Sequence, residues 1–181
     1  MAELFPRQNF AFLSPATEIL YGGAAGGGKS YLERTSAIRW CCEIPGIQVY
    51  LFRRTLPDLR DNHLRGPTCF QVMLSDYIQS GHVKGPTQEN ELKFWNGSVL
   101  HLCYCDSEND VTKYQGAEIH VLIMDELTHF TEYQYRFLRS RVRVAGLKIP
   151  DKYKDWPQKT GKDGKQYLVS PDGKQVIPLE K

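Results

Sequence analysis

The 181-residue sequence lacks any run of about eighteen apolar residues, and no basic segment followed by an apolar one stands at its start. These absences leave neither a membrane span nor a secretory signal in the sequence. Cysteine is scarce, with five residues, and Cys41 and Cys42 are adjacent on an expected helix. An odd number placed in this way does not suit a disulfide framework, so we expect a cytoplasmic protein with no membrane partner.

A strong excess of one charge sign is also missing. The net charge is +2, the hydrophobic content is 41% and the charged content is 24%, values typical of a soluble globular protein. The arginines are nevertheless gathered in two segments, with Arg53, Arg54, Arg60 and Arg65 in one and Arg136, Arg139, Arg141 and Arg143 in the other. Each cluster has two interpretations, a solvated basic surface with ordinary ion pairs or a contact with phosphate groups.

Residues 22–30, Gly-Gly-Ala-Ala-Gly-Gly-Gly-Lys-Ser, fit the phosphate-binding pattern G-x-x-x-x-G-K-[ST] from Gly23 onward. Small residues let successive backbone N–H groups curl round a phosphate. Lys29 would reach the β- and γ-phosphate oxygens, and the Ser30 hydroxyl would bind Mg²⁺. The pattern therefore predicts a site for ATP and Mg²⁺ that consists of Gly23, Ala24, Ala25, Gly26, Gly27, Gly28, Lys29 and Ser30.

The segments around this loop predict an α/β fold. Residues 18–21 have the pattern of a short strand, residues 30–42 that of a helix, and residues 47–52 that of a second strand. Strand, helix and strand in this order favour a mainly parallel sheet flanked by helices. A phosphate would then lie at the N-terminus of the helix, where unpaired N–H groups favour an anion.

A second motif lies at residues 119–126, where an apolar run ends in two carboxylates. A strand buried on both faces of a parallel sheet needs such a run, and ligands bind at the edge where these strands end. Asp125 is expected to bind Mg²⁺ together with Ser30. Glu126 is expected to polarise the water that attacks the γ-phosphate, while Lys29 neutralises charge. The two motifs together predict nucleotide binding and, through Glu126, hydrolysis.

Two further segments have clear local patterns. Residues 91–95 and 98–104 alternate around Asn96-Gly97, which predicts a β-hairpin insertion with a type I′ turn. Thr131 is placed to begin a helix that carries the second arginine cluster.

The composition divides the chain near residue 148. Before it we expect a P-loop ATPase domain over residues 1–147. After it Lys, Asp, Gly and Pro dominate, and residues 163–168 and 172–177 are near repeats of a turn followed by a short strand. Residues 148–181 therefore have two interpretations, a small β-hairpin extension or an incompletely ordered polar tail.

Gln8 stands out in the polar and aromatic segment before the first motif. Its amide offers a donor and an acceptor to an adenine edge, while a plain surface glutamine is the alternative interpretation. Arg53 and Arg54 directly follow the strand of residues 47–52, where contact with phosphate or DNA and ordinary ion pairs are both open.

With both nucleotide motifs in place, the sequence resembles the ATPase half of the large terminase subunit of tailed bacteriophages. The match covers about residues 5 to 150. It is carried by residues 18–30, Phe52-Arg53-Arg54-Thr55, Leu59-Arg60, Asn96-Gly97-Ser98, residues 114–118, Asp125-Glu126 and residues 138–143. The resemblance implies a P-loop NTPase fold of the additional-strand class, with Gln8 near the adenine and Glu126 as the catalytic glutamate.

The same resemblance implies a motor that couples ATP hydrolysis to the movement of double-stranded DNA into a capsid, in the cytoplasm of the host cell. The implied partners are the DNA, the portal protein, the small terminase subunit and further copies of the chain in a ring.

Two departures from the family pattern change these expectations. Relatives often carry an arginine, proposed to act on a neighbour's nucleotide, at the place of Gln115, so that Arg139, Arg141 or another arginine would have to serve here. A coupling motif and a nuclease domain with metal-binding carboxylates follow in the family, and neither is found after Arg143. We therefore expect an N-terminal fragment without nuclease activity.

The leading hypothesis is thus the ATPase domain of a packaging motor. One alternative is a non-catalytic remnant that binds nucleotide or DNA, which differs from the first in lacking turnover. The other alternative is a helicase-like ATPase that acts on nucleic acid. The glycine-rich loop and the Tyr114-Gln115-Gly116 segment argue against this last alternative.

Overall fold

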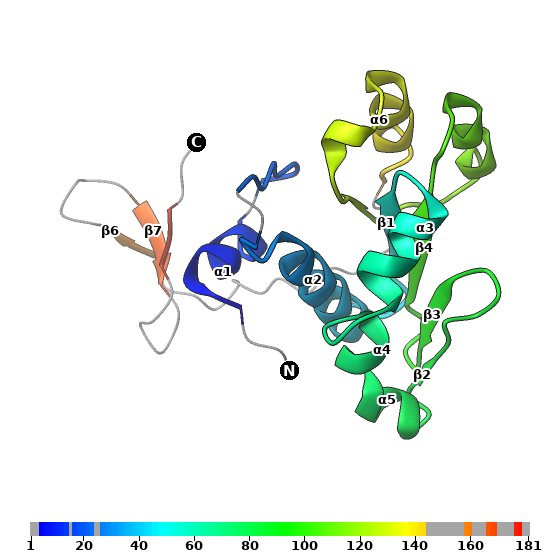
Figure 1. Ribbon diagram of the computed structural model, residues 1–181. Coiled ribbons are helices and arrows are strands. Elements are labelled where there is room, and N and C mark those ends of the chain that lie inside the picture. The colour runs from blue at the N-terminus through cyan, green and yellow to red at the C-terminus, as the bar shows by residue number, and fades with distance from the viewer. Residues whose placement is uncertain are drawn as a thin grey trace. The chain divides into compact units, whose positions relative to one another are not determined.

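The computed structural model describes residues 4–14, 16–23, 26–143, 158–160, 166–169 and 176–178 (Figure 1). The chain forms two compact units. The first consists of Met1–Leu4 and Gly22–Lys148, and the second of Phe5–Tyr21 and Ile149–Lys181. The sequence-based division at residue 148 stays a prediction.

A five-stranded sheet with the order β2-β3-β4-β1-β5 organises the first unit. β1 lies between β4 and β5 and pairs in parallel with both, whereas β2, β3 and β4 pair antiparallel. The predicted α/β class is confirmed, but the sheet is mixed rather than mainly parallel because the hairpin strands belong to it. The strands are β1 (Gln48–Arg53), β2 (Val83–Lys84), β3 (Glu91–Phe94), β4 (Val99–Tyr104) and β5 (Val121–Met124).

Short helices connect these strands, apart from one long helix before β1. That helix is α2 (Lys29–Glu43), which confirms the helix predicted over residues 30–42. The others are α3 (Leu56–Leu59), the π-helix η1 (Arg60–Leu64), α4 (Phe70–Met73), α5 (Ser75–Gln79), the 3₁₀ helices η2 (Glu108–Tyr114) and η3 (Leu127–His129), and α6 (Glu132–Arg139). In the part of the chain that the structure describes, no helix is long and apolar enough to cross a bilayer.

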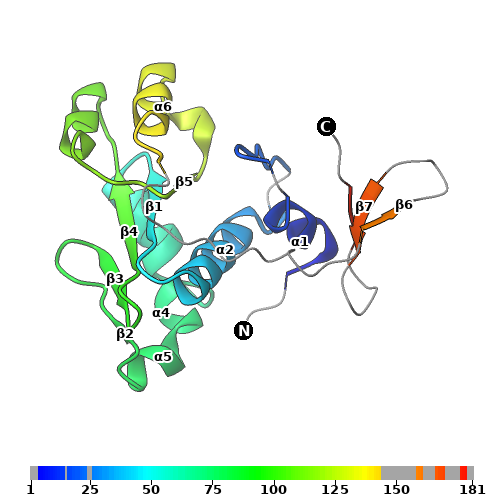
Figure 2. The ribbon, with the colours of Figure 1, turned by 180° about the vertical axis from the view of Figure 1, so that it is seen from behind.

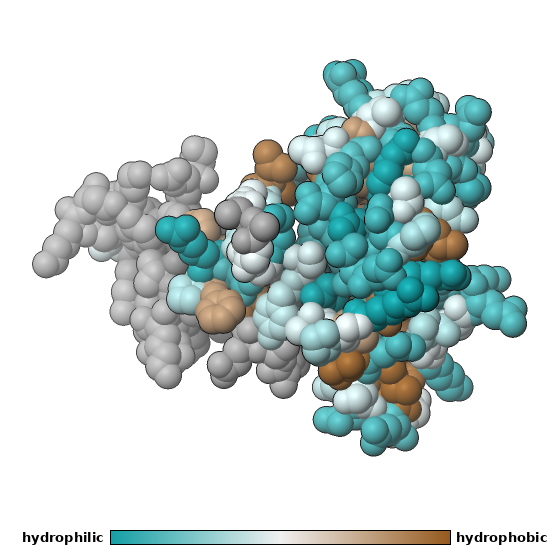
Figure 3. Space-filling model, in the orientation of Figure 1, coloured by the Kyte–Doolittle hydropathy of each residue, from teal (hydrophilic) through white to brown (hydrophobic). Residues whose placement is uncertain are grey.

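Each face of the sheet carries its own apolar core, because successive side chains of a strand point to opposite faces. Val49 and Leu51 of β1 join a core that also contains buried residues of α2, α3 and α4. Phe52 of β1 joins a second core with residues of β4, η2 and α6. Helices therefore cover both faces (Figure 2), and the outer surface in the view of Figure 3 is mainly hydrophilic with separate apolar spots.

The strand predicted over residues 18–21 does not form, so this prediction is wrong. These residues have no regular structure, and Leu20 is 84% exposed. An apolar and aromatic pattern supplies strand propensity, but a strand also needs a neighbouring ladder of hydrogen bonds. Within the described residues, β5 pairs with β1 along one edge and carries no strand along the other.

The β3–β4 hairpin is confirmed, but its turn differs from the predicted type I′. Gly97 has a φ of 82°, whereas Asn96 is not among the residues with positive φ. The Gly97 N–H donates to the carbonyl of Phe94, and the Phe94 N–H donates to the carbonyl of Ser98. This is a type I turn followed by a left-handed glycine, the common three-residue hairpin loop.

The tip of this hairpin also caps the C-terminal end of α2. The Asn96 side-chain amide donates to the carbonyl of Cys41 at 2.8 Å, and the Ser98 hydroxyl donates to the carbonyl of Ile44 at 2.8 Å. The last carbonyls of a helix have no partner within the helix and need one from outside. The hairpin therefore fixes where α2 ends relative to the sheet.

In the second unit the structure describes one helix and three strands. α1 (Pro6–Phe12) begins with a capping arrangement in which the Phe5 N–H donates to the Gln8 Oε1 atom at 2.9 Å. β6 (Gln158–Thr160), β7 (Gln166–Val169) and β8 (Val176–Pro178) form an antiparallel sheet. The strand parts of the two near repeats are β7 and β8, and their turns lie outside the described residues.

The cap supplied by Asn96 predicts a loss of stability on Asn96→Ala. Removal of the amide leaves half-buried carbonyls at the end of α2 without this donor, so we expect the free energy of unfolding to fall by about 1–2 kcal/mol. Urea denaturation followed by circular dichroism measures this change. The matched control is Asn109→Ala, an exposed asparagine of η2. An equal effect of the two substitutions would contradict the capping role.

Candidate functional site

The glycine-rich loop leads directly into α2. Gly26 and Gly28 have left-handed backbones, with φ of 81° and 73°, and Gly28 is the N-cap residue directly before α2. A side chain at either position would be strained, which explains the glycines there. The loop thereby leads into the first helical turn, whose N–H groups have no acceptor within the helix itself. Gly27 lies between the two left-handed residues, and Ala24 and Ala25 lie outside the described residues.

Lys29 turns its side chain back over the loop. Its Nζ atom donates to the carbonyl of Gly23 at 3.0 Å, so the ammonium group lies against the backbone at the start of the loop. Ser30 follows in the first turn of α2. The residues present fit a phosphate, because cationic and N–H donors are gathered at one helix N-terminus. The contacts of these residues with a nucleotide stay a prediction.

Asp125 lies at the end of β5 and is buried, with 1% exposure. Its Oδ2 atom accepts a hydrogen bond from the Nε2 atom of His63 at 3.0 Å. The Nε atom of Arg53 lies 3.2 Å from the same oxygen as an ion pair, without the alignment of a hydrogen bond. One carboxylate oxygen is therefore held by two neighbours.

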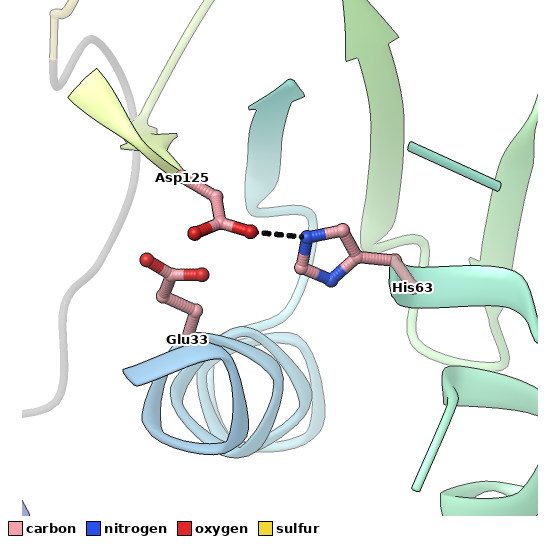
Figure 4. A group of neighbouring side chains, drawn as sticks. All are labelled: Glu33, His63 and Asp125. Atoms are coloured by element: carbon pink, nitrogen blue, oxygen red, sulfur yellow. Dashed lines mark hydrogen bonds and ion pairs between the residues drawn. The ribbon is translucent and has the colours of Figure 1, made fainter. Parts of the chain in front are cut away.

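Glu33 of α2 completes the group. Figure 4 shows its carboxylate turned toward Asp125, with His63 of η1 on the other side. One potential ligand atom from each of Glu33, His63 and Asp125 lies within 4.8 Å of the other two, and no other such group of three occurs among the described residues. Two carboxylates at one point suit a hard divalent cation such as Mg²⁺, so the residues present fit the predicted ion.

The two carboxylates differ in their ionisation. Burial, with the negative charge of Asp125 as the next cause, raises the pKa of Glu33 to about 8. Burial alone would also raise the pKa of Asp125, but the hydrogen bond from His63 and the charge of Arg53 outweigh it and hold that pKa below its usual value. Burial lowers the pKa of His63, so its imidazole is neutral at pH 7. Without a cation, the pair therefore keeps its proton on Glu33.

Glu126 has a very different environment from its neighbour Asp125. Its side chain is exposed, and its backbone is left-handed with φ of 55° and ψ of 58°. A residue other than glycine in this conformation is strained, and such strain is concentrated at functional sites. The turn places one acid of the pair inside the protein and the other in solvent. The catalytic role of Glu126 stays a prediction.

The first two residues of the first arginine cluster, Arg53 and Arg54, interact with other groups of the protein. Arg53 is 9% exposed beside Asp125, and the guanidinium of Arg54 donates to the carbonyl of Cys105. The sequence left ordinary ion pairs and contact with phosphate or DNA both open for these two residues. The structure shows an ion pair for Arg53 and a contact with a backbone carbonyl for Arg54. Neither is placed as an exposed phosphate-binding residue.

In the second cluster, Arg136 forms an exposed ion pair with Glu132 at 2.6 Å. The guanidinium of Arg141 lies 5.0 Å from the centre of the Phe137 ring, and its Nη1 atom donates to the carbonyl of Gln115 at 3.3 Å. An arginine from the residues just after α6 therefore contacts the backbone of Gln115. The predicted helix start is confirmed, with the Thr131 Oγ1 atom accepting from the N–H of Gln134, but α6 ends at Arg139, so Arg141 and Arg143 lie beyond it.

Gln8 is buried in the second unit. Since the two units are not placed relative to one another, its contact with an adenine stays a prediction. Sequence reasoning missed Glu33 and His63. Glu33 lies three residues after Ser30 and so faces the same side of the helix, which is a usable signal. His63 is 62 positions from Asp125 in a segment without a motif, and no pattern points to it.

A glycine-rich loop leads into a helix whose Glu33 lies close to a buried aspartate at the end of a parallel strand, and this defines an α/β protein with candidate anion and cation sites. A family model described as "Terminase large subunit, T4likevirus-type, N-terminal" matches residues 20–147. This is more than half of the chain, which therefore belongs to that family and confirms the resemblance seen in the sequence. Comparisons with curated proteins and with solved structures gave no match.

The raised pKa of Glu33 predicts that the difference in stability between the wild type and Glu33→Gln changes with pH. On folding, this carboxyl takes up a proton between its ordinary pKa of 4.5 and about 8, so its contribution to stability falls as the pH rises through this window. Glu33→Gln removes the titration. We expect the variant to gain stability relative to the wild type from pH 5 to pH 8, in chemical denaturation with EDTA present. A stability difference that stays the same over this pH range would contradict a protonated Glu33 in the folded protein.

The left-handed backbone at Glu126 predicts that glycine is tolerated better than alanine. Glu126→Gly and Glu126→Ala remove the same carboxylate, but only alanine keeps the strain between its Cβ and the backbone. We expect the glycine variant to be more stable than the alanine variant by about 1 kcal/mol in urea denaturation. The reverse order would mean that the backbone is not left-handed there.

Proposed function

We propose that this chain is the ATP-binding and ATP-hydrolysing domain of a viral DNA-packaging motor. One observation carries the proposal: the helix that follows the glycine-rich loop reaches the end of the acidic strand, with ligand atoms of Glu33 and Asp125 within 4.8 Å. Phosphate-binding and cation-binding groups are thus gathered at one edge of the sheet, as ATP with Mg²⁺ requires. Membership of the terminase large-subunit family supports the same function.

The residues divide the work as follows. Backbone N–H groups of the loop and the Lys29 ammonium hold the phosphates, and Ser30 and Asp125 hold Mg²⁺. The bound ion supplies neutralisation of phosphate charge. Glu126 orients a water and takes its proton as the water oxygen attacks the γ-phosphorus, while the bond to the bridging oxygen breaks to leave ADP and phosphate. The exposed position of Glu126 beside the buried Asp125 supports this division.

We also assign the chain to the additional-strand class of P-loop NTPases. Such a sheet needs a further parallel strand beside the acidic one. β5 supports the assignment, because its apolar residues are only half-buried and one of its edges carries no strand within the described residues. Double-stranded DNA, the portal protein, the small terminase subunit and further copies in a ring are the partners that the family supports, in the cytoplasm of the infected host.

The proposal predicts ATP turnover that needs Mg²⁺, Lys29 and Glu126. Lys29→Ala and Glu126→Gln should each lower the steady-state rate by about 100-fold or more, because they remove charge neutralisation and the general base. Lys84→Ala and Glu108→Gln, exposed residues of β2 and η2, are the matched controls and should leave the rate unchanged. The rate is measured with and without double-stranded DNA and at rising protein concentration.

The outcomes separate the hypotheses. Turnover that rises with protein concentration supports a site completed by a neighbouring copy, and stimulation by DNA supports the packaging motor. Binding of ATP that depends on Lys29, without turnover under any of these conditions, would contradict the hydrolase and leave a nucleotide-binding domain.

A further inference from the structure

We propose that His63 is a positioning residue for the divalent cation, which it serves by orienting the Asp125 carboxylate, and that Arg34 fixes the imidazole tautomer needed for this. The inference rests on the proposed function and adds two residues to it. Neither belongs to the glycine-rich loop or to the acidic pair. His63 is fully buried and Arg34 is 5% exposed, so both interact with the protein interior.

The neighbours of the imidazole determine its tautomer. The Nη1 atom of Arg34 lies 3.5 Å from the Nδ1 atom of His63, and a guanidinium can only donate. Nδ1 must therefore be the unprotonated nitrogen. The proton then lies on Nε2, which donates to the Oδ2 atom of Asp125 at 3.0 Å. The two contacts are compatible with a single neutral tautomer.

Arg34 is itself held in place from the segment that carries His63. Its Nη1 atom donates to the carbonyl of Asn62 at 2.8 Å, and its Nη2 atom donates to the hydroxyl of Thr68 at 3.1 Å. Thr68, after η1, thus contacts Arg34 of α2. Arg34 contacts His63 of η1, and His63 contacts Asp125 at the end of β5. Three elements that are distant in sequence determine the direction of one carboxylate.

This arrangement decides which atoms are left for a cation. In the tautomer described, Nε2 carries a proton and Nδ1 faces a guanidinium, so His63 itself cannot be a ligand. The ligands that remain in the cluster are the carboxylate oxygens of Asp125 and Glu33, which suit a hard ion such as Mg²⁺ or Mn²⁺ rather than one that prefers nitrogen. Hydrogen-bonded neighbours of a metal-binding carboxylate fix its orientation and raise its affinity for the ion.

The test compares side chains that differ in the position of a single donor. His63→Gln places an amide N–H near the original Nε2 position, His63→Asn is too short to reach Asp125, and His63→Leu has no donor. A fluorescent ATP analogue is titrated into each folded variant in EDTA and at rising Mg²⁺ concentration. We expect the leucine and asparagine variants to need about 10- to 100-fold more Mg²⁺ for tight binding. The glutamine variant should stay close to the wild type.

A purely structural role would give a different result. It would weaken nucleotide binding equally in EDTA and in Mg²⁺, with no rescue by glutamine. The control for a buried polar residue away from the site is Ser98→Ala in the β3–β4 hairpin, at the opposite end of the sheet from Asp125, which should lower stability but leave the Mg²⁺ dependence unchanged. Circular dichroism shows which variants are folded.

The tautomer is measured on the wild-type chain without nucleotide, so this measurement does not depend on nucleotide binding. In nitrogen-15 NMR of the imidazole side chains, the His63 signal is identified by its loss in His63→Gln, and it should be that of a neutral imidazole protonated at Nε2. Protonation at Nδ1 would overturn the inference.

The remaining outcomes distinguish this inference from the proposed function. A wild-type chain that binds no nucleotide would overturn both. A folded His63→Leu variant with the wild-type Mg²⁺ dependence would overturn the positioning role alone.

Discussion

The parallel pairing of β1 with β5 is the interaction on which the candidate site depends. Phe52 lies opposite Met124 in this ladder, and the N–H of Asp125 donates to the carbonyl of Phe52 at 3.0 Å. Arg53 and Asp125 therefore leave the sheet side by side, which creates their ion pair. A shift of the register by one residue would turn Asp125 to the other face of the sheet and separate it from α2.

The charges gathered at this edge are costly to bury, and the structure compensates by pairing them. Asp125 is held by His63 and Arg53, and Glu33 keeps a proton because burial disfavours its charge. In proteins generally, replacing a buried ion pair with apolar residues of similar volume is often neutral or stabilising. Paired buried charges with displaced pKa values are therefore better understood as part of a binding site than as a device for stability.

The same edge is held together on the opposite face of the sheet by α6. Gln134 is fully buried, and its amide donates to the carbonyls of Cys105 and Ser107, just beyond the end of β4. Arg54, which follows β1, donates to the same carbonyl of Cys105. The ends of β1 and β4 and the helix after β5 thus share one set of hydrogen bonds, so the helix that follows the acidic pair is fixed relative to the sheet.

The local elements of this protein were determined by its sequence. α2, β1, the hairpin and the apolar strand before Asp125 all have short-range patterns of spacing and turn residues, and each formed within about two residues of its predicted bounds. The last of these strands is half-buried, however, and not buried on both faces as predicted, because it carries a neighbouring strand along one edge only within the described residues. The strand expected over residues 18–21, the turn type at Asn96-Gly97 and the gathering of Glu33, His63 and Arg53 around Asp125 were decided only by the tertiary structure. Strand pairing and contacts across 62 positions of chain depend on register and packing, which local patterns do not encode.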